Sequence, residues 1–544
     1  MLLLRALALV LVVDVVSTIA DPIFNKNMLF PSLVVGRPPG GFQKTGYRQN
    51  VGASSLPDSP DPKTFKQSVD HFSNPDTSTW DQEYWYNAKF VNTSLYGGRD
   101  LVFIVVGGAS YEQEESVTNE QRQVVQWASE FGAHLFRLEH RFFSEKKTVG
   151  TATGFDSLRL LSTDQAAYDV VSFISAVTTM YKQTDPVRDQ FNTTVHAAVV
   201  SSGFVDYKRE NSDISTNMAN VLGSIKPNNQ RDNCDKLIKD TMDQLKDYLD
   251  GSGYLISDDL RLDPPFEQGK EPSELDKLHL QASIFSLYQA MMQFTSKPPN
   301  GFDTNKFTAE NMCDRLYGQH KTPFDAIFQL FKWYTSFYTG GDVASFPNSY
   351  SKVVQELKKG VTMESTDKET RQSAMWLWLT CSELGLFPVT DSSSVFQNLV
   401  PINPLSPFLH HEFLQGTNIF LSHGALDPWK GVGHTHYDSG SDNNEVVIII
   451  QNVAHSADLY AKQDNELPDV GSVRAQIKEF LTRATLPPPL SPNPPATGST
   501  PQAPPNSVSP SVDPGTGTPE FTTKSSVPLG QLLSVFLVAV LVIA

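Results

Sequence analysis

The segment Leu421–Trp429, which reads LSHGALDPW, carries the clearest evidence for the fold class. An apolar run that begins at Asn418 ends here in a glycine turn, and the turn delivers a carboxylate, Asp427. Side chains that do chemistry in open α/β sheets lie at the carboxyl ends of the strands. The next apolar run, Glu445–Gln451, is followed by His455. The pattern therefore predicts an α/β sheet that brings an acid and a histidine to the same edge.

Asp427 and His455 repeat the second half of the Ser, Asp, His chain order of α/β-hydrolases. That chemistry needs both residues, because an imidazole must take the proton of a weakly nucleophilic serine and a carboxylate must hold the tautomer of the imidazole. A single Asp after a glycine turn usually caps the turn, and a single His is usually structural. The order and the two strand contexts together favour a catalytic acid and base.

Other short apolar runs extend the sheet, and a helical region interrupts it. The β-rich runs are typical of buried parallel strands, and they comprise residues 101–106, 134–138, 195–200, 418–421 and 446–450. Apolar residues at helical spacing predict a helix over 162–181, and residues 206–345 are mostly helical in pattern. We therefore predict an α/β-hydrolase fold built from residues 63–205 and 346–486, with residues 206–345 as a helical cap insertion.

The two ends of the chain read as segments outside the folded domain. Residues 1–20 are typical of an export signal, in preference to an N-terminal membrane anchor, and residues 21–62 of a loosely ordered lead-in or pro-segment. Residues 487–519 have the Pro, Ser and Thr composition of an extended stalk. The apolar residues within 520–544 favour a glycolipid-anchor signal over a short tail anchor, which would leave this anchor as the only membrane attachment.

Bulk composition narrows the class of protein. Lys and Arg total 43 against 60 Asp and Glu, a net charge of −17 that argues against a nucleic-acid partner. Three cysteines allow one disulfide, of unspecified pairing, and no Cys/His cluster suggests a metal site or cofactor. Asn92 and Asn192 lie in glycosylation sequons, which fits a secreted or cell-surface glycoprotein. The pattern predicts no particular oligomeric state.

Five blocks in the same order resemble the lysosomal Pro-Xaa carboxypeptidase family, which includes prolylcarboxypeptidase, dipeptidyl peptidase II and thymus-specific serine protease. They are Leu138–Phe143, Leu158–Ala166, Thr380–Glu383, Gly424–Trp429 and Ala454–Asp458, and the resemblance runs from about Phe65 to Leu481. The resemblance implies a serine-type exopeptidase acting on proline-containing peptides. It also implies that Asp427 is the triad acid and His455 the general base, with a cap domain after Val205 and a lysosome as a further possible location.

The chain departs from that family at the nucleophile. The family carries a Gly-Gly-Ser-Tyr elbow before the strand that begins here near Val195, whereas residues 182–194 form only a short polar connector. A strand and its crossover helix need on the order of two dozen residues, so one central βα unit is missing by this reading. The family's Gly-Gly-Glu-Gly becomes Gly107-Gly108-Ala109-Ser110, whose backbone amides near Gly107 and Gly108 are candidates for an oxyanion hole. His423 stands where the family usually has Asn.

Three serines are candidates to replace the missing nucleophile. Ser201 and Ser202 end a strand but lack the small neighbours of an elbow, and Ser252 lies in the helical insertion without a preceding strand. Three hypotheses follow: a proline-directed serine exopeptidase, of carboxypeptidase or dipeptidyl-peptidase type; an inactive cell-surface pseudoenzyme that binds peptides or proteins; or a gapped product of splicing or gene assembly whose complete parent is active. The third gains weight because loss of a central strand exposes strand edges.

Overall fold

The computed structural model describes residues 62–485 and 539–543. Within the first range it omits 74–77, 97–99, 107–114, 121, 145–148, 151–153, 181–194, 196, 205–210, 229, 294, 296–307, 340–342, 363, 366, 385–387, 392–393, 397–398, 401–417, 437–444, 461 and 463–465. The predicted signal, most of the lead-in and the stalk therefore lie outside the described residues.

All five predicted strands are confirmed, and they lie in one eight-stranded sheet of order β1-β2-β4-β3-β10-β5-β8-β9. They are β3 (Val102–Val106), β4 (His134–Leu138), β5 (Ala197–Ser201), β8 (Ile419–Gly424) and β9 (Glu445–Ile450). The pairs β3–β4, β5–β8 and β8–β9 are parallel. The β3 sequence VFIVV is apolar at every position because both faces of such a strand are covered. The mixed α/β class is thus confirmed.

Three strands of the sheet were not predicted, and two of them, β2 and β10, run opposite to the parallel strands. β1 (Lys63–Ser68) and β2 (Thr79–Asn87) form an edge hairpin, and their polar residues conceal the strand pattern. β10 (Ala539–Ile543) lies between β3 and β5 and is antiparallel to both. The sequence reading assigned this apolar segment to an anchor signal, and a segment removed for anchoring cannot also complete the sheet. The two fates are mutually exclusive, and the anchor remains a prediction.

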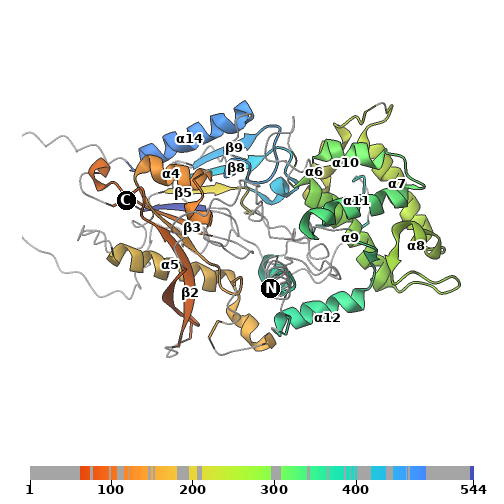
Figure 1. Ribbon diagram of the computed structural model, residues 1–544, viewed down its shortest axis with the longest axis horizontal. Coiled ribbons are helices and arrows are strands. Elements are labelled where there is room, and N and C mark those ends of the chain that lie inside the picture. The colour runs from red at the N-terminus through yellow and green to blue at the C-terminus, as the bar shows by residue number, and fades with distance from the viewer. Residues whose placement is uncertain are drawn as a thin grey trace, which may run out of the picture.

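Helices cover both faces of the sheet, as Figure 1 shows, with α4 and α14 on one side and α5 on the other. The predicted helix at 162–181 is confirmed as α5. The helices of the sheet region and of the segments flanking the insertion are α3 (Glu115–Thr118), α4 (Gln123–Phe131), α5 (Thr163–Met180), α12 (Tyr350–Val361), α13 (Lys368–Leu379) and α14 (Pro468–Thr485); short helices are η1 (Thr93–Tyr96), η2 (Gly154–Leu160), η4 (Thr380–Leu384) and η5 (Pro428–Val432).

The core is divided by the sheet because successive side chains of a strand point to opposite faces. Val102 and Ile104 of β3 pack in the cluster that contains α5 and the insertion helices. Phe103 and Val105 pack in the cluster that contains α4 and α14. The sheet is therefore buried on both sides.

The interval predicted as the helical insertion contains six described helices, grouped beside the sheet in Figure 1. They are α6 (Ser212–Gly223), α7 (Cys234–Leu249), α8 (Tyr254–Leu260), α9 (Glu274–Met292), α10 (Ala309–Leu316) and α11 (Pro323–Thr339), and a two-stranded pair, β6 (Leu262–Asp263) and β7 (Phe346–Pro347), lies at their end. A disulfide joins Cys234 of α7 to Cys313 of α10, and Cys381 is free. This pairing was left open by the sequence, and it is consistent with the secretory pathway.

Candidate active site

Asp427 lies just past the carboxyl end of β8, where the sequence pattern placed it. Gly424 is required at the strand end because a β-carbon there would overlap the carbonyl oxygen of Ala454. Asp427 then caps η5, and its Oδ1 accepts a hydrogen bond from the backbone N–H of Trp429 at 3.0 Å. The carboxylate is fully buried. One of its oxygens is thus held by the backbone, which leaves the other to orient a partner.

His455 is that partner, and it lies in the turn after β9. Its Nδ1 is 2.9 Å from Oδ2 of Asp427, and both side chains are buried. With Nδ1 protonated and donating to the carboxylate, the ring is held in the tautomer whose Nε2 is basic. The structure therefore brings the two predicted residues into one buried acid–base pair, across 28 residues of sequence.

His423 lies in β8 on the approach to Asp427 and is also buried. Its pKa is lowered to about 4, mainly by burial; the nearby Asp427 acts in the opposite direction, and His455 adds to the lowering. The ring is therefore neutral at pH 7. A neutral ring does not compete with His455 as a cation beside the carboxylate.

The two strand-end serines have structural partners. Ser201 Oγ donates to Oδ1 of Asp458 at 2.6 Å, and Ser422 Oγ donates to Oδ2 of the same carboxylate at 2.7 Å. Ser202 has a positive φ of 54°, and its Oγ accepts the backbone N–H of Ser456 at 2.9 Å. Asp458 thus ties together β5, β8 and the turn after β9. The sequence motif around Asp458 did not predict that this residue links the strand ends.

Ser252, the third serine weighed, lies in the turn between α7 and α8. Its backbone N–H bonds the carbonyl oxygen of Tyr248 at 2.7 Å, which closes the end of α7. This position is a helix connection, distant in topology from the carboxyl edge of the sheet.

Phe204 lies beside the imidazole of His455, and two tryptophans pack against Phe204. The Phe204 ring centroid is 6.3 Å from that of His455 and 4.9 Å from that of Trp429. Trp376 of α13 lies 6.5 Å from Phe204, and all three aromatic side chains are buried. The acid–base pair therefore lies in a dry environment, where a hydrogen bond to a charge is stronger than in water.

Gln293, the residue that follows α9, reaches the same pair from the helical insertion. Its backbone oxygen accepts the N–H of His455 at 3.0 Å, and its Oε1 accepts the indole N–H of Trp429 at 2.9 Å. The sequence reading missed Gln293 because nothing local relates it to a motif 136 residues away.

The remaining predicted site residues are placed as follows. Gly107, Gly108 and Asn192 lie outside the described residues. Asn92 is exposed at the start of η1, where it is accessible for modification. Among the described residues no cluster of three or more His, Cys, Asp or Glu side chains could hold a metal ion, and no described helix is long and apolar enough to cross a bilayer.

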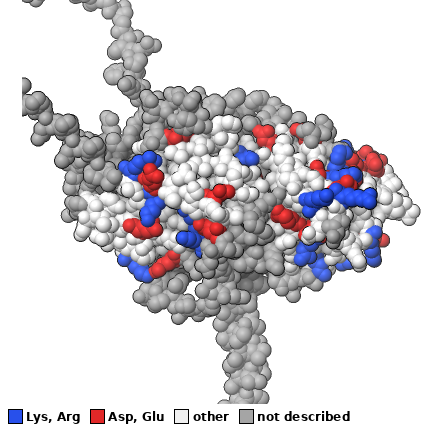
Figure 2. Space-filling model, turned by 90° about the horizontal axis from the view of Figure 1, so that it is seen from above, with Lys and Arg blue, Asp and Glu red and all other residues white. Residues whose placement is uncertain are grey.

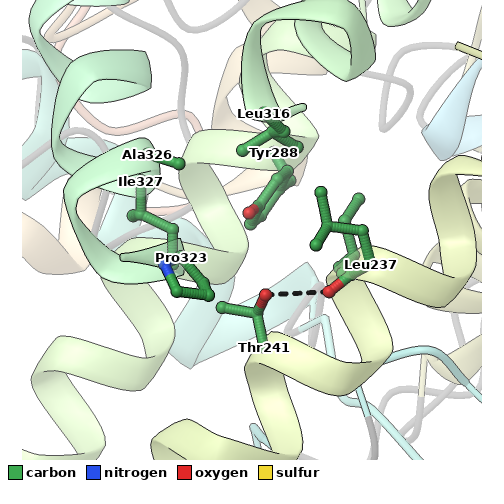
Figure 3. Close-up of a pocket in the computed structure, with 8 residues that line it drawn as sticks. Leu237, Thr241, Tyr288, Leu316, Pro323, Ala326 and Ile327 are labelled. Carbon is green, nitrogen blue, oxygen red and sulfur yellow. Dashed lines mark hydrogen bonds between the residues drawn. The ribbon is translucent and has the colours of Figure 1, made fainter. Parts of the chain in front are cut away.

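A small cavity lies within the insertion, away from the acid–base pair. Figure 3 shows Tyr288 and Thr241 facing it among apolar side chains from α7, α10 and α11, with the Thr241 hydroxyl donating to the carbonyl oxygen of Leu237 at 2.8 Å. Burial raises the pKa of Tyr288 above its ordinary value. The cavity has room for about one water molecule, so it is a packing feature.

The visible surface carries both signs of charge. Figure 2 shows Lys and Arg side chains interspersed with Asp and Glu, most densely over the insertion helices. Along α7, Lys236 pairs with Asp240 and Lys239 with Asp243. Such pairing weakens the local positive electrostatic potential that would attract a polyanion.

Comparison with known proteins finds one family and two curated relatives. The family described as "Serine carboxypeptidase S28" matches residues 67–409 and 406–477. A Caenorhabditis elegans protein named as a "putative serine protease" is 26% identical over 463 residues, which cover 76% of this chain and 82% of the relative. A second protein so named, from the same nematode, is 22% identical over 534 residues, or 87% of this chain and 98% of the relative.

Proposed function

Because the chain belongs to the serine carboxypeptidase S28 family, we propose that its site is that of a serine-type exopeptidase that hydrolyses peptides next to proline. Family membership implies peptide substrates and an α/β-hydrolase fold. The observation that carries the proposal is the buried contact of 2.9 Å between Nδ1 of His455 and Oδ2 of Asp427 at the carboxyl edge of a parallel sheet.

The geometry supports a division of roles. His455 takes the proton of the attacking hydroxyl and returns it to the leaving amine, so its ring is transiently a cation. Asp427 stabilises that cation and holds the tautomer, and the backbone N–H of Trp429 keeps the carboxylate from rotating. Because the pair is buried, the stabilisation is stronger than at an exposed site.

The aromatic side chains beside the pair support proline as the neighbouring residue. Phe204 lies next to the imidazole, and Trp376 and Trp429 pack against Phe204, so the surroundings of the imidazole are apolar and aromatic. A proline ring is apolar and its nitrogen has no N–H when acylated, so it buries against aromatic faces without stranding a donor. Carboxypeptidase and dipeptidyl-peptidase cleavage both place proline beside the scissile bond.

The nucleophile is the part of the triad that we propose this chain lacks. Three features support the loss of one βα unit: the short connector before β5, the engagement of Ser201 with Asp458, and the reversed strand β10 between β3 and β5. Since β10 is antiparallel to β5, its carboxyl end lies at the edge opposite Asp427 and His455. A residue that follows β10 therefore cannot present a hydroxyl to the imidazole.

A second function follows from those same observations. A chain that retains the acid, the base and the aromatic side chains but has no nucleophile binds peptides without cleaving them. We propose peptide binding at the cell surface for this chain, and hydrolysis for a longer product in which the βα unit is present. The domain limits, the export signal, the sugar at Asn92 and Asn192, the oxyanion role of Gly107 and Gly108 and the lipid anchor are parts of this proposal.

The test is covalent labelling of the purified chain with a fluorophosphonate, alongside hydrolysis of proline-containing chromogenic peptides. We expect neither label nor hydrolysis from this chain, and both from a version with a Gly-x-Ser-x segment restored between Tyr181 and Val195. The restored version with His455→Ala serves as its control and should lose hydrolysis by at least about 1,000-fold.

Labelling of the chain as it stands would contradict the absence of a nucleophile. Ser201→Ala, Ser202→Ala and Ser252→Ala then identify the serine responsible, because only the variant that lacks it would lose the label. Sequencing of the transcript between the codons for Tyr181 and Val195 shows independently whether the longer product exists.

A further inference from the structure

A closed chain of hydrogen bonds links the helical insertion to the acid–base pair. Asp427 accepts the backbone N–H of Trp429 at 3.0 Å, and the Trp429 indole N–H donates to Gln293 Oε1 at 2.9 Å. The backbone oxygen of Gln293 accepts the N–H of His455 at 3.0 Å, and Nδ1 of His455 lies 2.9 Å from Asp427 Oδ2, which closes the ring. Four residues from three separate segments form this ring. Each of the four side chains is at most 2% exposed.

Gln293 occupies a particular position in this ring, because it is the member that comes from the insertion. It follows the last turn of α9, where its own N–H bonds the carbonyl oxygen of Gln289 and its φ and ψ are still helical. Its backbone oxygen is one of the terminal helix carbonyls that have no partner within the helix. That oxygen is used to hold the base, and the side chain is used to hold the turn that carries the acid.

We propose that Gln293 is a positioning residue, and that the insertion orients the acid–base pair through it. Gln293 bonds the backbone N–H of His455 and the indole of Trp429, and it acts through these two groups. The insertion is then a structural part of the catalytic edge as well as a cover for it. The proposal rests on the proposed function for its catalytic meaning, whereas its test measures a proton and not turnover.

The physical reason is the sensitivity of a buried hydrogen bond to small displacements. The bond from His455 to Asp427 lies between two turns, each fixed at one end by a strand. Loss of the indole bond frees the Trp429 side chain and leaves a buried N–H without a partner, which destabilises the η5 turn. The carboxylate then samples other orientations, and the Nδ1 proton of His455 becomes accessible to exchange.

The experiment measures solvent exchange of the His455 Nδ1 proton by NMR in the full chain labelled at histidine rings, with the signal assigned by its loss in His455→Gln. We expect Gln293→Met to speed exchange by about tenfold or more. Gln293→Glu retains an acceptor oxygen for the indole N–H and should exchange more slowly than Gln293→Met. Trp429→Phe removes the same bond from the other side and should match Gln293→Met, with no additional effect in the double variant.

Gln289→Met provides the matched control. Gln289 lies one turn earlier on α9 and is equally buried, but its carboxamide has no hydrogen-bond partner within the described structure. We expect its substitution to leave the exchange rate unchanged. Equal exchange in Gln293→Met and wild type would overturn the proposal, as would equal acceleration in Gln289→Met, which would indicate general loosening. An inactive restored enzyme with the expected exchange pattern would instead count against the proposed function alone.

Discussion

The two halves of the sheet differ in the direction of their strands. In the half formed by β5, β8 and β9, all strands are parallel, and the turns that follow them meet at one edge. In the neighbouring half, β10 lies between β3 and β5 with the reverse direction. Strand direction determines which end of a strand lies at the edge that holds Asp427 and His455. The carboxyl ends of β8 and β9 lie at that edge, whereas the carboxyl end of β10 lies at the opposite edge.

The comparison also separates two kinds of stabilisation. The parallel half is tied at its edge by Asp458, which accepts hydrogen bonds from Ser201 and Ser422. The bonds that hold β10 are backbone bonds to β3 and β5, formed by a segment 53 residues beyond the end of α14. An apolar segment can pair with exposed strand edges without a specific side-chain pattern.

The largest expected effect comes from removing β10. A chain that ends at Val538 should lose most of its folding free energy, on the order of 5 kcal/mol or more, and aggregate, because β3 and β5 would each expose an unpaired edge. Urea denaturation and light scattering of the two chains measure the difference. Equal stability of the two chains would contradict this prediction, because it would show that β10 is dispensable for folding and could be removed for anchoring.

A cysteine pair tests the register of β10 directly. Leu541 is opposite Ile104, so Ile104→Cys with Leu541→Cys in a Cys381→Ser background should form an intramolecular disulfide. Ile104→Cys with Ile543→Cys is the control, because Ile543 is opposite Val102. Cross-linking between two chains would show that the segment is exchanged between copies.

A smaller effect is expected from Asp458→Ala in the parallel half. The substitution leaves the buried hydroxyls of Ser201 and Ser422 without their acceptor, and should destabilise the fold by about 3 kcal/mol. Urea denaturation again measures the change. Asp469→Ala, which removes an exposed acid from the first turn of α14, should cost less than about 1 kcal/mol. Similar losses in both variants would show that the tie at the strand ends is unimportant.

The smallest expected effect of a single residue is the contribution of one buried histidine to the dependence of stability on pH. Burial lowers the pKa of His140, His279 and His423 from 6.5 to about 4. Between those values the unfolded chain binds protons that the folded chain does not, so stability is full above about pH 6.5 and falls as the pH drops toward 4. At pH 5 each histidine should cost roughly 1–2 kcal/mol relative to pH 7.

His423→Asn sharpens this prediction within the parallel half. The variant should remove about a third of the loss between pH 7 and pH 5, whereas His436→Asn, at an exposed position, should leave it unchanged. Urea denaturation at the two pH values gives the comparison. A loss that is the same in wild type and His423→Asn would mean that the ring is not kept neutral by burial.

Local patterns were sufficient for the acid–base pair and for the five strands that carry the sheet. Each strand is a short apolar run. Asp427 and His455 each follow directly after a strand, and because these strands are parallel, both residues are expected at the same edge of the sheet. The hairpin β1–β2 was not predicted, because the buried polar residues Gln67, Gln82 and Glu83 interrupt the apolar pattern of its strands.

The sequence by itself determined the mixed α/β class, the placement of Asp427 and His455 and the absence of a recognisable nucleophile elbow, because these depend on contiguous residues. Only the tertiary structure decided that Cys234 pairs with Cys313, that Gln293 reaches the acid–base pair and that β10 lies between β3 and β5. Those contacts join residues separated by 79 positions or more. Their formation depends on packing of the whole chain, and no local pattern specifies it.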